Sequence, residues 1–350
     1  MRVPVSEVNR VPGTTPYYGA NGIQGYVDGY THKGEYILIA EDGANDLKNY
    51  PVQYVNGKLW VNNHAHVLQG KLDISDTSYL GYAISQTNIE PFLVGGGRAK
   101  LNASTMMKIL ISAPQNTREQ QRIGLVFNSI DSLITLHQRK YDKLSNVKKA
   151  LLDKMFPKNG ELVPSLRFKG FTDTWEQCGF KELGKTYTGL SGKSAMDFGH
   201  GQGKYVTYMN VFSNPISNLS VTEKIEVDNK QNQVKHGDVF FTTSSETPQE
   251  VGMSSVWLGK EENIYLNSFC FGFRPSIDVD PYYLAILLRS PNVRDDIALL
   301  AQGISRYNIS KTRMMDNEIC IPDIKEQQRI GSLFNNLDNL ITLHQRKWCI

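Results

Sequence analysis

Residues 119–124 read EQQRIG, and the same six letters return at residues 326–331, a shift of 207 positions. The match continues at the same shift, because LITLHQRK stands at residues 133–140 and again at residues 340–347. Agreement over this length at one shift indicates a tandem duplication, and a duplication decides the fold class before any single element does. We therefore expect one structural unit, built twice.

Upstream of these segments the similarity fades but keeps its order. Residues 97–102 parallel residues 303–308, and residues 60–62 parallel residues 265–267. Near-identity in the repeated segments indicates the same task done twice, such as pairing with its own copy or presenting one face to two identical partners. The diverged parts indicate two different targets.

The repeated segments have the pattern of a coiled coil, with apolar residues at alternating spacings of four and three. We expect a helix from residue 118 to residue 156, because nothing in this range breaks a helix except Gly124 near its start, and Pro157 ends it. At about 1.5 Å per residue this helix would be roughly 58 Å long. The residues expected to pair the two helices are Ile123, Phe127, Ile130, Ile134, His137, Tyr141, Ile330, Phe334, Leu337, Ile341, His344 and Trp348.

Periodicity alone would also fit an ordinary bundle helix. Two copies separated by a whole domain favour an antiparallel pair that holds two domains at a fixed separation. His137 and His344 fall on the pairing face, where a polar residue sets the register more often than it binds a metal.

The diverged parts predict strands and loops. Short apolar runs rich in β-branched and aromatic residues, such as 36–40 and 238–242, are separated by Gly, Asn and Asp, and a short helix is expected at 281–290. The expected fold class is α+β, a pseudo-twofold repeat of two domains with small mixed sheets and short helices, joined by two long helices in an antiparallel coiled coil. The expected boundaries are a first domain at 1–113, a spacer helix and linker at 114–170, a second domain at 171–322 and a second helix at 323–350.

Composition excludes several classes of protein. The 350 residues exceed a single ordinary core, and 40% hydrophobic with 21% charged residues is typical of folded chains. A net charge of +3 means that any nucleic-acid surface must come from local clustering. The four cysteines form no CxxC pair, and no apolar run is long enough to span a membrane, so we expect a cytoplasmic protein without membrane contact.

Three segments resemble catalytic or metal-binding motifs, but each lacks a residue that its motif requires. Residues 189–194 read GLSGKS, but a phosphate-binding loop needs glycine where Tyr187 stands. His64 and His66 alternate along a probable strand without a further ligand at metal spacing, and Asn214-Pro215 lacks the continuation of a methyltransferase motif. We expect recognition surfaces, with no catalytic residue and no metal site.

The loops combine glycine with amide, hydroxyl, aromatic and basic side chains, which can approach a phosphate backbone and hydrogen-bond to base edges. The alternative is that they are ordinary polar loops. Arg98, Lys100 and Arg306 suit phosphate contacts, although such charges can also be merely solvated. The candidate DNA-contacting residues are Tyr18, Asn21, Asp42, Asn45, Arg98, Lys100, Lys193, Gln202, Lys204, Tyr205, Thr243, Ser244, Ser245 and Arg306.

In combination these motifs resemble the specificity subunit of type I restriction-modification systems, over essentially the whole chain. The resemblance rests on the repeated helix, on PSLRF at 164–168 with Phe171 and Trp175, and on GDVFFTTSSE at 237–246. It implies two target-recognition domains, each reading one half of a split DNA sequence. A nuclease acting alone would be the competing enzymatic class.

The resemblance also implies partners. Family members bind double-stranded DNA and two methyltransferase subunits, which carry S-adenosylmethionine, and through them the restriction subunits, which use ATP and Mg²⁺. The chain itself is expected to bind no cofactor and to act in host defence. Two alternatives stay open: a coiled-coil assembly factor that does not bind DNA, and an inactive product of a rearranged gene, since Trp175 has no counterpart in the first copy and the second helix stops at Ile350.

Overall fold

The computed structural model describes residues 2–95, 99–158 and 160–346. The chain divides into two compact units, unit 1 (Met1–Leu136) and unit 2 (His137–Ile350). The division falls inside one continuous helix, α3 (Thr117–Lys154), which contributes its first part to unit 1 and its second part to unit 2. Within the described ranges, no helix is both long and apolar enough to cross a membrane.

Unit 1 is built on a five-stranded sheet, counted over the described residues, in the order β2-β1-β4-β3-β5. Neighbouring strands are antiparallel except β1 and β4, which are parallel. Ile37 and Ile39 pack on one face against Ile84 of the first helix, while Leu38 packs on the other face, as the period of two in a strand requires. The elements are η1 (Glu7–Asn9), β1 (Pro12–Gly19), β2 (Gly22–Val27), β3 (His32–Ala40), β4 (Val52–Val61), β5 (Ala65–Leu68), α1 (Thr77–Ser85), η2 (Glu90–Phe92) and α2 (Ala103–Met106).

Unit 2 has four small sheets among its described residues, in the orders β12-β10-β14-β7, β13-β8-β9, β11-β15 and β16-β6. Its strands are β6 (Glu176–Gly179), β7 (Gly184–Thr188), β8 (Phe198–Val206), β9 (Thr222–Ile225), β10 (Val239–Thr242), β11 (Ser244–Ser245), β12 (Ser254–Val256), β13 (Ile264–Leu266), β14 (Cys270–Pro275), β15 (Tyr307–Asn308) and β16 (Glu318–Ile321). Its other elements are α4 (Phe180–Leu183), η3 (Ala195–Asp197), α5 (Tyr208–Ser213), η4 (Pro248–Glu250), α6 (Pro281–Leu287), α7 (Pro291–Leu299), α8 (Lys311–Met315) and α9 (Ile324–Arg346).

The two units share one pattern of strand pairing. In unit 1 the long strand β4 pairs with β3 and, in parallel, with β1. In unit 2 two separate strands make the corresponding pairings: β12 pairs with β10, and β13 pairs in parallel with β8. The diverged parts are therefore one fold, with a single sheet in unit 1 and a split sheet in unit 2.

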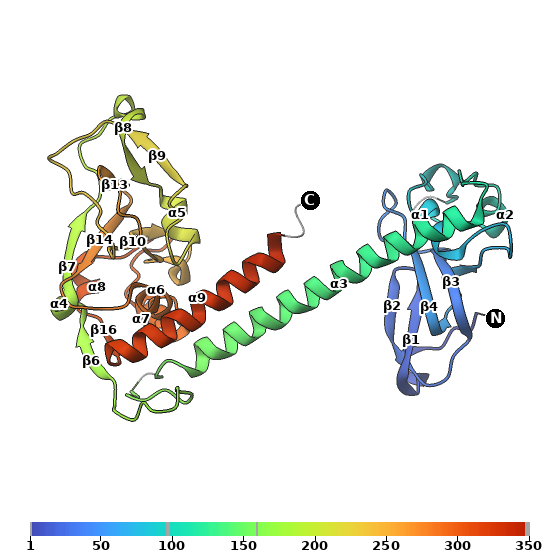
Figure 1. Ribbon diagram of the computed structural model, residues 1–350, viewed down its shortest axis with the longest axis horizontal. Coiled ribbons are helices and arrows are strands. Elements are labelled where there is room, and N and C mark those ends of the chain that lie inside the picture. The colour runs from blue at the N-terminus through green and yellow to red at the C-terminus, as the bar shows by residue number, and fades with distance from the viewer. Residues whose placement is uncertain (1, 96–98, 159, 347–350) are drawn as a thin grey trace. The chain divides into compact units, whose positions relative to one another are not determined.

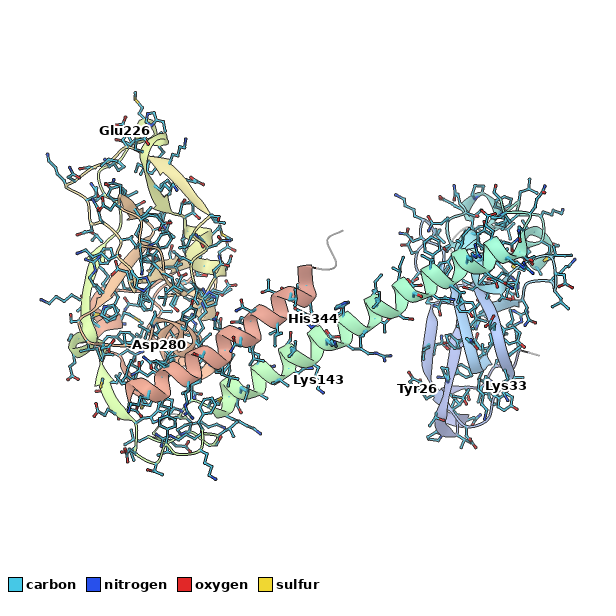
Figure 2. All side chains as sticks on the ribbon, in the orientation of Figure 1. Tyr26, Lys33, Lys143, Glu226, Asp280 and His344 are labelled. Carbon is cyan, nitrogen blue, oxygen red and sulfur yellow. The ribbon has the colours of Figure 1, made fainter. Side chains whose placement is uncertain are left out.

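Within unit 2, α9 lies antiparallel to the second part of α3 (Figure 1). The Nδ1 atoms of His137 and His344 are 2.9 Å apart, and His344 is labelled near the end of α9 in Figure 2. Further along, Lys148 of α3 forms an ion pair with Asp338 of α9. A later residue of α3 thus contacts an earlier residue of α9, as expected for two antiparallel helices.

The start of α9 belongs to the core of unit 2. Ile330, Phe334 and Leu337 are buried there against Met155 and Phe156 from the end of α3. Phe334 is completely buried, and its ring centroid lies 6.1 Å from that of Phe156. Burial of such side chains stabilises a fold by roughly 1.5–3 kcal/mol each.

Two of the three corresponding positions of the first copy are exposed within unit 1, and the third, Ile123, is half-buried. Phe127, the counterpart of Phe334, is 44% exposed and contacts the ring of Tyr82 at 4.9 Å between centroids. Ile130 and Ile134 are also exposed on α3. The expected pairing of Ile123, Phe127, Ile130 and Ile134 with the second helix stays a prediction, as does the role of the half-buried Ile341. Trp348 lies outside the described residues.

The segment that follows α3 within unit 2 returns to the start of α9. Arg167 donates through Nε and Nη2 to the two carboxylate oxygens of Glu326, both at 2.7 Å, and Glu326 is fully buried. The rings of Trp175 and Phe156 pack edge to face, with their centroids 6.2 Å apart. These contacts give the PSLRF segment and Trp175 a structural role: they hold the segment after α3 against the start of α9 and the end of α3. Glu119, the counterpart of Glu326, is exposed.

One glutamine in each repeat attaches the helix to its own unit. Gln120 accepts a hydrogen bond from the backbone N–H of Asp76 at 2.9 Å, and Gln327 accepts one from Asp280 at 3.0 Å. Both aspartates cap a helix, α1 in unit 1 and α6 in unit 2. The Gln120 amide also donates to the carbonyl of Pro114, and the Gln327 amide to that of Pro322.

A glycine lets each helix approach closely. A Cβ on Gly124 would lie 2.9 Å from Ser78 Oγ and 3.0 Å from the backbone nitrogen of Tyr79, and one on Gly331 would lie 2.8 Å from that of Tyr283. Real Cβ atoms are rarely this close to backbone atoms. The EQQRIG segment is therefore repeated because its glutamine and glycine make the same docking contact twice.

The expected α+β class, with small sheets and two long helices, is confirmed. The helix expected at 281–290 is shorter, because Ser290 Oγ donates to the carbonyl of Leu287 and Pro291 begins the separate helix α7. The expected domain boundaries stay a prediction.

Replacing Glu326 by Gln should lower the free energy of unfolding of unit 2 by about 3 kcal/mol, because it leaves Arg167 without its carboxylate in a buried site. Glu119→Gln, the exposed counterpart, is the matched control and should change stability by less than about 0.5 kcal/mol. Chemical denaturation of the two variants checks this; equal losses would contradict the structural role of the pair.

Gly331→Ala should destabilise the chain by roughly 1–3 kcal/mol, although alanine is the better helix former, because the added Cβ meets Asp280 and Tyr283. Ser332→Ala, at the exposed neighbouring position, should leave stability unchanged or slightly raised. Thermal unfolding distinguishes the cases, and a stabilised Gly331→Ala variant would rule out the close approach.

Candidate nucleic-acid interface

In unit 1 several expected DNA-contacting residues meet where β3 ends. The Asn21 amide donates to the carbonyl of Gly43, and the Asn21 side-chain oxygen accepts from the backbone N–H of Asn45, both at 2.9 Å. The backbones of Asp42 and Lys100 form an antiparallel bridge. Asn21, Asp42, Asn45 and Lys100 therefore come together, with Asn45 exposed.

Charges in this cluster neutralise one another. Glu41 forms ion pairs with Arg2 and with Lys100, the latter at 3.1 Å. Burial opposes ionisation of Glu41, but hydrogen bonds from Arg2 and Lys100 outweigh it and lower its pKa. His64 Nδ1 lies 2.5 Å from an oxygen of Asp42, and His66 is buried against the Leu101 carbonyl.

This cluster has the residue types of a metal site without the arrangement of one. Across the described ranges, no group of three or more His, Cys, Asp or Glu side chains is placed to hold a metal ion.

Tyr18 lies on β1, where burial raises the pKa of its hydroxyl. Its carbonyl accepts a hydrogen bond from the backbone of Asn62 at 3.0 Å. Arg98 lies outside the described residues.

In unit 2 the expected residues Ser244, Ser245 and Arg306 line one open pocket of about 720 Å³. The strand pair β11 and β15 brings them together, and Arg306 Nη2 lies 3.4 Å from Ser244 Oγ. Thr243 precedes them and donates its hydroxyl to the carbonyl of Phe269 at 2.8 Å. The structure thus assembles one group from distant parts of the sequence.

The rest of the lining of this pocket was not expected from the sequence. It includes Tyr208, Met209 and Phe212 from α5, together with Glu246 and Glu250. Tyr208 and Phe212 are stacked with centroids 5.9 Å apart, and the Tyr208 hydroxyl donates to the carbonyl of Ser244. Their spacing of four in the sequence is the usable signal, because it places both rings on one side of a helix.

Two half-buried arginines hold parts of the pocket lining in place. Arg289 donates to the carbonyls of Val211 and Phe212 at 2.9 and 3.0 Å, which fixes the end of α5. Arg294 donates to the carbonyls of Gln249, Val251 and Gly252, which fixes the segment around Glu250. Burial lowers the pKa of each guanidinium to about 10.

The GDVFFTTSSE segment is anchored at its own start. Asp238 accepts two hydrogen bonds from Arg274, at 2.7 and 2.6 Å, and a third from the Tyr187 hydroxyl at 2.7 Å. Burial raises the pKa of Tyr187. Strand β10 therefore begins at a fixed point. Thr243, Ser244 and Ser245 follow its other end, and the two serines line the pocket.

The remaining expected residues of unit 2 form a second group along β8. Lys193 pairs with Asp228 at 2.8 Å, and this hydrogen bond lowers the pKa of Asp228 to about 2. Tyr205 donates to Glu223, while Gln202 and Lys204 are exposed. DNA contact by any of the expected residues stays a prediction.

The two assembled groups occupy corresponding places in the repeat. Val94 and Lys100 form a bridge in unit 1, and Gln302 and Asn308 form one in unit 2. The backbone of Leu101 bonds to the Glu41 carbonyl, and that of Ile309 bonds to the Thr243 carbonyl. One scaffold therefore carries carboxylates, amides, imidazoles and a lysine in unit 1, but hydroxyls, aromatic rings, two carboxylates and an arginine in unit 2.

Comparison with known proteins agrees with this duplication. The family model for the type I restriction modification DNA specificity domain matches residues 1–146 and again residues 173–348. A protein of Haemophilus influenzae classified as a type I restriction enzyme specificity subunit is 29% identical, and the alignment covers 97% of this chain and 85% of that protein. The MjaVIII specificity subunit of Methanocaldococcus jannaschii is 21% identical over 89% of this chain and 74% of its own length.

Among solved structures, the S subunit of a type I restriction-modification system from M. genitalium is similar in fold. Its TM-score is 0.58 at 12% sequence identity, with 99% of this chain and 88% of that chain covered. Since the family model matches well over half of the sequence, this chain belongs to the family of type I restriction-modification DNA specificity proteins.

Proposed function

We propose that this chain is the non-catalytic specificity subunit of a type I restriction-modification complex, in which each unit reads one half of a bipartite DNA target. Family membership gives the coarser role, recognition specificity for DNA. The observation that carries the finer proposal is the pair of corresponding residue groups, one around Asp42 and Asn45, the other around Ser244 and Arg306. One scaffold with two unlike sets of side chains suits two unlike half-sites.

The chemistry of the two groups suits base edges. An exposed asparagine such as Asn45 can make the paired hydrogen bonds that adenine offers in the major groove, whereas Arg306 matches guanine. Backbone contacts would fix the register of the protein on the duplex, because phosphates carry no sequence information. The two half-sites would then differ in sequence.

The repeated helices support a scaffolding role in this proposal. The EQQRIG segment makes one docking contact in both units, so two similar surfaces are available to two methyltransferase subunits, with restriction subunits joining through them. S-adenosylmethionine, ATP and Mg²⁺ would belong to those partners, and the chain would bind none of them. The complex would act in the cytoplasm, where the DNA is.

Methylation mapping tests the proposed function. DNA from a host carrying this gene should show methylated adenines in one split motif with two different halves, and DNA from a host lacking the gene should not. Co-purification with methyltransferase subunits but without any motif would instead support an assembly factor. Cleavage by the isolated chain with Mg²⁺ would support a nuclease.

Asn45→Ala should relax the motif at one base pair of a single half-site, by about 1–3 kcal/mol of discrimination, and leave the other half unchanged. Asn56→Ala is the control, because Asn56 pairs opposite Glu35 within the β3–β4 ladder and outside the group around Asn45. Motif mapping with each variant is the measurement. Changes in both halves, or in neither, would argue against separate readers.

A further inference from the structure

The pocket of unit 2 is lined by a cation and an anion that do not pair with each other. Arg306 and Glu250 both line it, yet no ion pair joins them or links Arg306 to any carboxylate in the described part of the chain. The single described side-chain bond of Arg306 is the long contact to Ser244. Its guanidinium therefore keeps most of its donors for a ligand.

Glu250 keeps an acceptor as well. Its Oε2 accepts from the Thr247 hydroxyl at 2.9 Å and from the Ser245 hydroxyl at 3.3 Å. Within residues 2–95, 99–158 and 160–346, no donor reaches Oε1. The two hydroxyls hold the carboxylate in place from one side, and Arg294 holds the backbone on both sides of it.

A phosphate does not suit this pocket. Glu246 and Glu250 both line it and are exposed, so a phosphate bound to Arg306 would lie near two carboxylates. Like charges repel one another, which disfavours a phosphate there. A neutral group that offers both acceptors and a donor would satisfy both charges.

A G·C base pair offers that combination in the major groove. Guanine presents the acceptors N7 and O6, which match an arginine, and cytosine presents the N4 amino donor, which matches a carboxylate. An A·T pair reverses both groups, because adenine presents its N6 amino group and thymine its O4 acceptor. An arginine and a glutamate together therefore discriminate at both bases.

We propose that Arg306 and Glu250 together read one G·C base pair in the half-site of unit 2, with Arg306 on guanine and Glu250 on cytosine. This inference rests on the proposed function and names the bases that one of its readers takes. The side chains of Tyr208, Met209 and Phe212 would border the base pair. Met209 is 60% exposed, and the rings of Tyr208 and Phe212 beside it are stacked. Exclusion of water there would strengthen both hydrogen bonds.

Methylation mapping of the assembled complex tests the inference with Arg306→Lys, Arg306→Ala and Glu250→Ala. Arg306→Lys keeps the charge but loses the paired donors. Arg306→Lys and Glu250→Ala should each relax the same G·C position roughly 10- to 100-fold, while the half-site of unit 1 stays unchanged. Glu262→Ala removes an exposed carboxylate of unit 2 outside the pocket and should leave the motif intact.

Other outcomes overturn the inference. If Arg306→Ala weakens methylation at all targets equally and Arg306→Lys restores it, Arg306 contacts phosphate. A motif that neither pocket variant changes shows that the pocket reads no base, while the proposed function stands. Absence of any motif for the unaltered chain overturns the proposed function itself, and this inference with it. Thermal unfolding of each variant confirms that it is folded.

Discussion

The hydrogen bond between a buried glutamine of each repeat and the cap of a domain helix is the constraint on which the structure depends. Gln120 bonds to Asp76 and Gln327 to Asp280 with nearly the same geometry. Both glutamines are almost fully buried, so an unpaired amide there would be unfavourable. The helix and its domain therefore have one favourable arrangement, and it occurs twice in the chain.

This constraint separates what must stay the same from what can vary. The docking segment contacts helix starts and backbone atoms, so it tolerates little change. The groups at the ends of β3 and β10 are positioned by corresponding backbone bridges. Asn45, Met209 and Arg306 are exposed, so the packing of the core does not determine which side chains stand at these positions. Recognition can therefore change while the docking contact is kept, which is what two unlike readers on one scaffold require.

Sequence periodicity predicted the long helices and placed His137 and His344 on their pairing face, because repeats and heptads report local structure directly, and apolar runs rich in β-branched residues predicted the strands. It could not distinguish Phe127 from Phe334, which share one pattern but differ in burial, since burial depends on what packs against each. The loop composition indicated Ser244 and Arg306, but not Glu250 or Met209. Those residues join the pocket through tertiary contacts, among them the hydrogen bonds from Arg289 to α5 and from Arg294 to the backbone beside Glu250.

Hydrogen exchange at the backbone amides of Asp76 and Asp280 tests the central claim most directly. Each amide precedes a helix, where exchange is usually fast, but each should be protected because it donates to a buried glutamine. Gln120→Ala should remove protection at Asp76 alone, and Gln327→Ala at Asp280 alone. Rapid exchange of both amides in the unaltered protein would contradict the account.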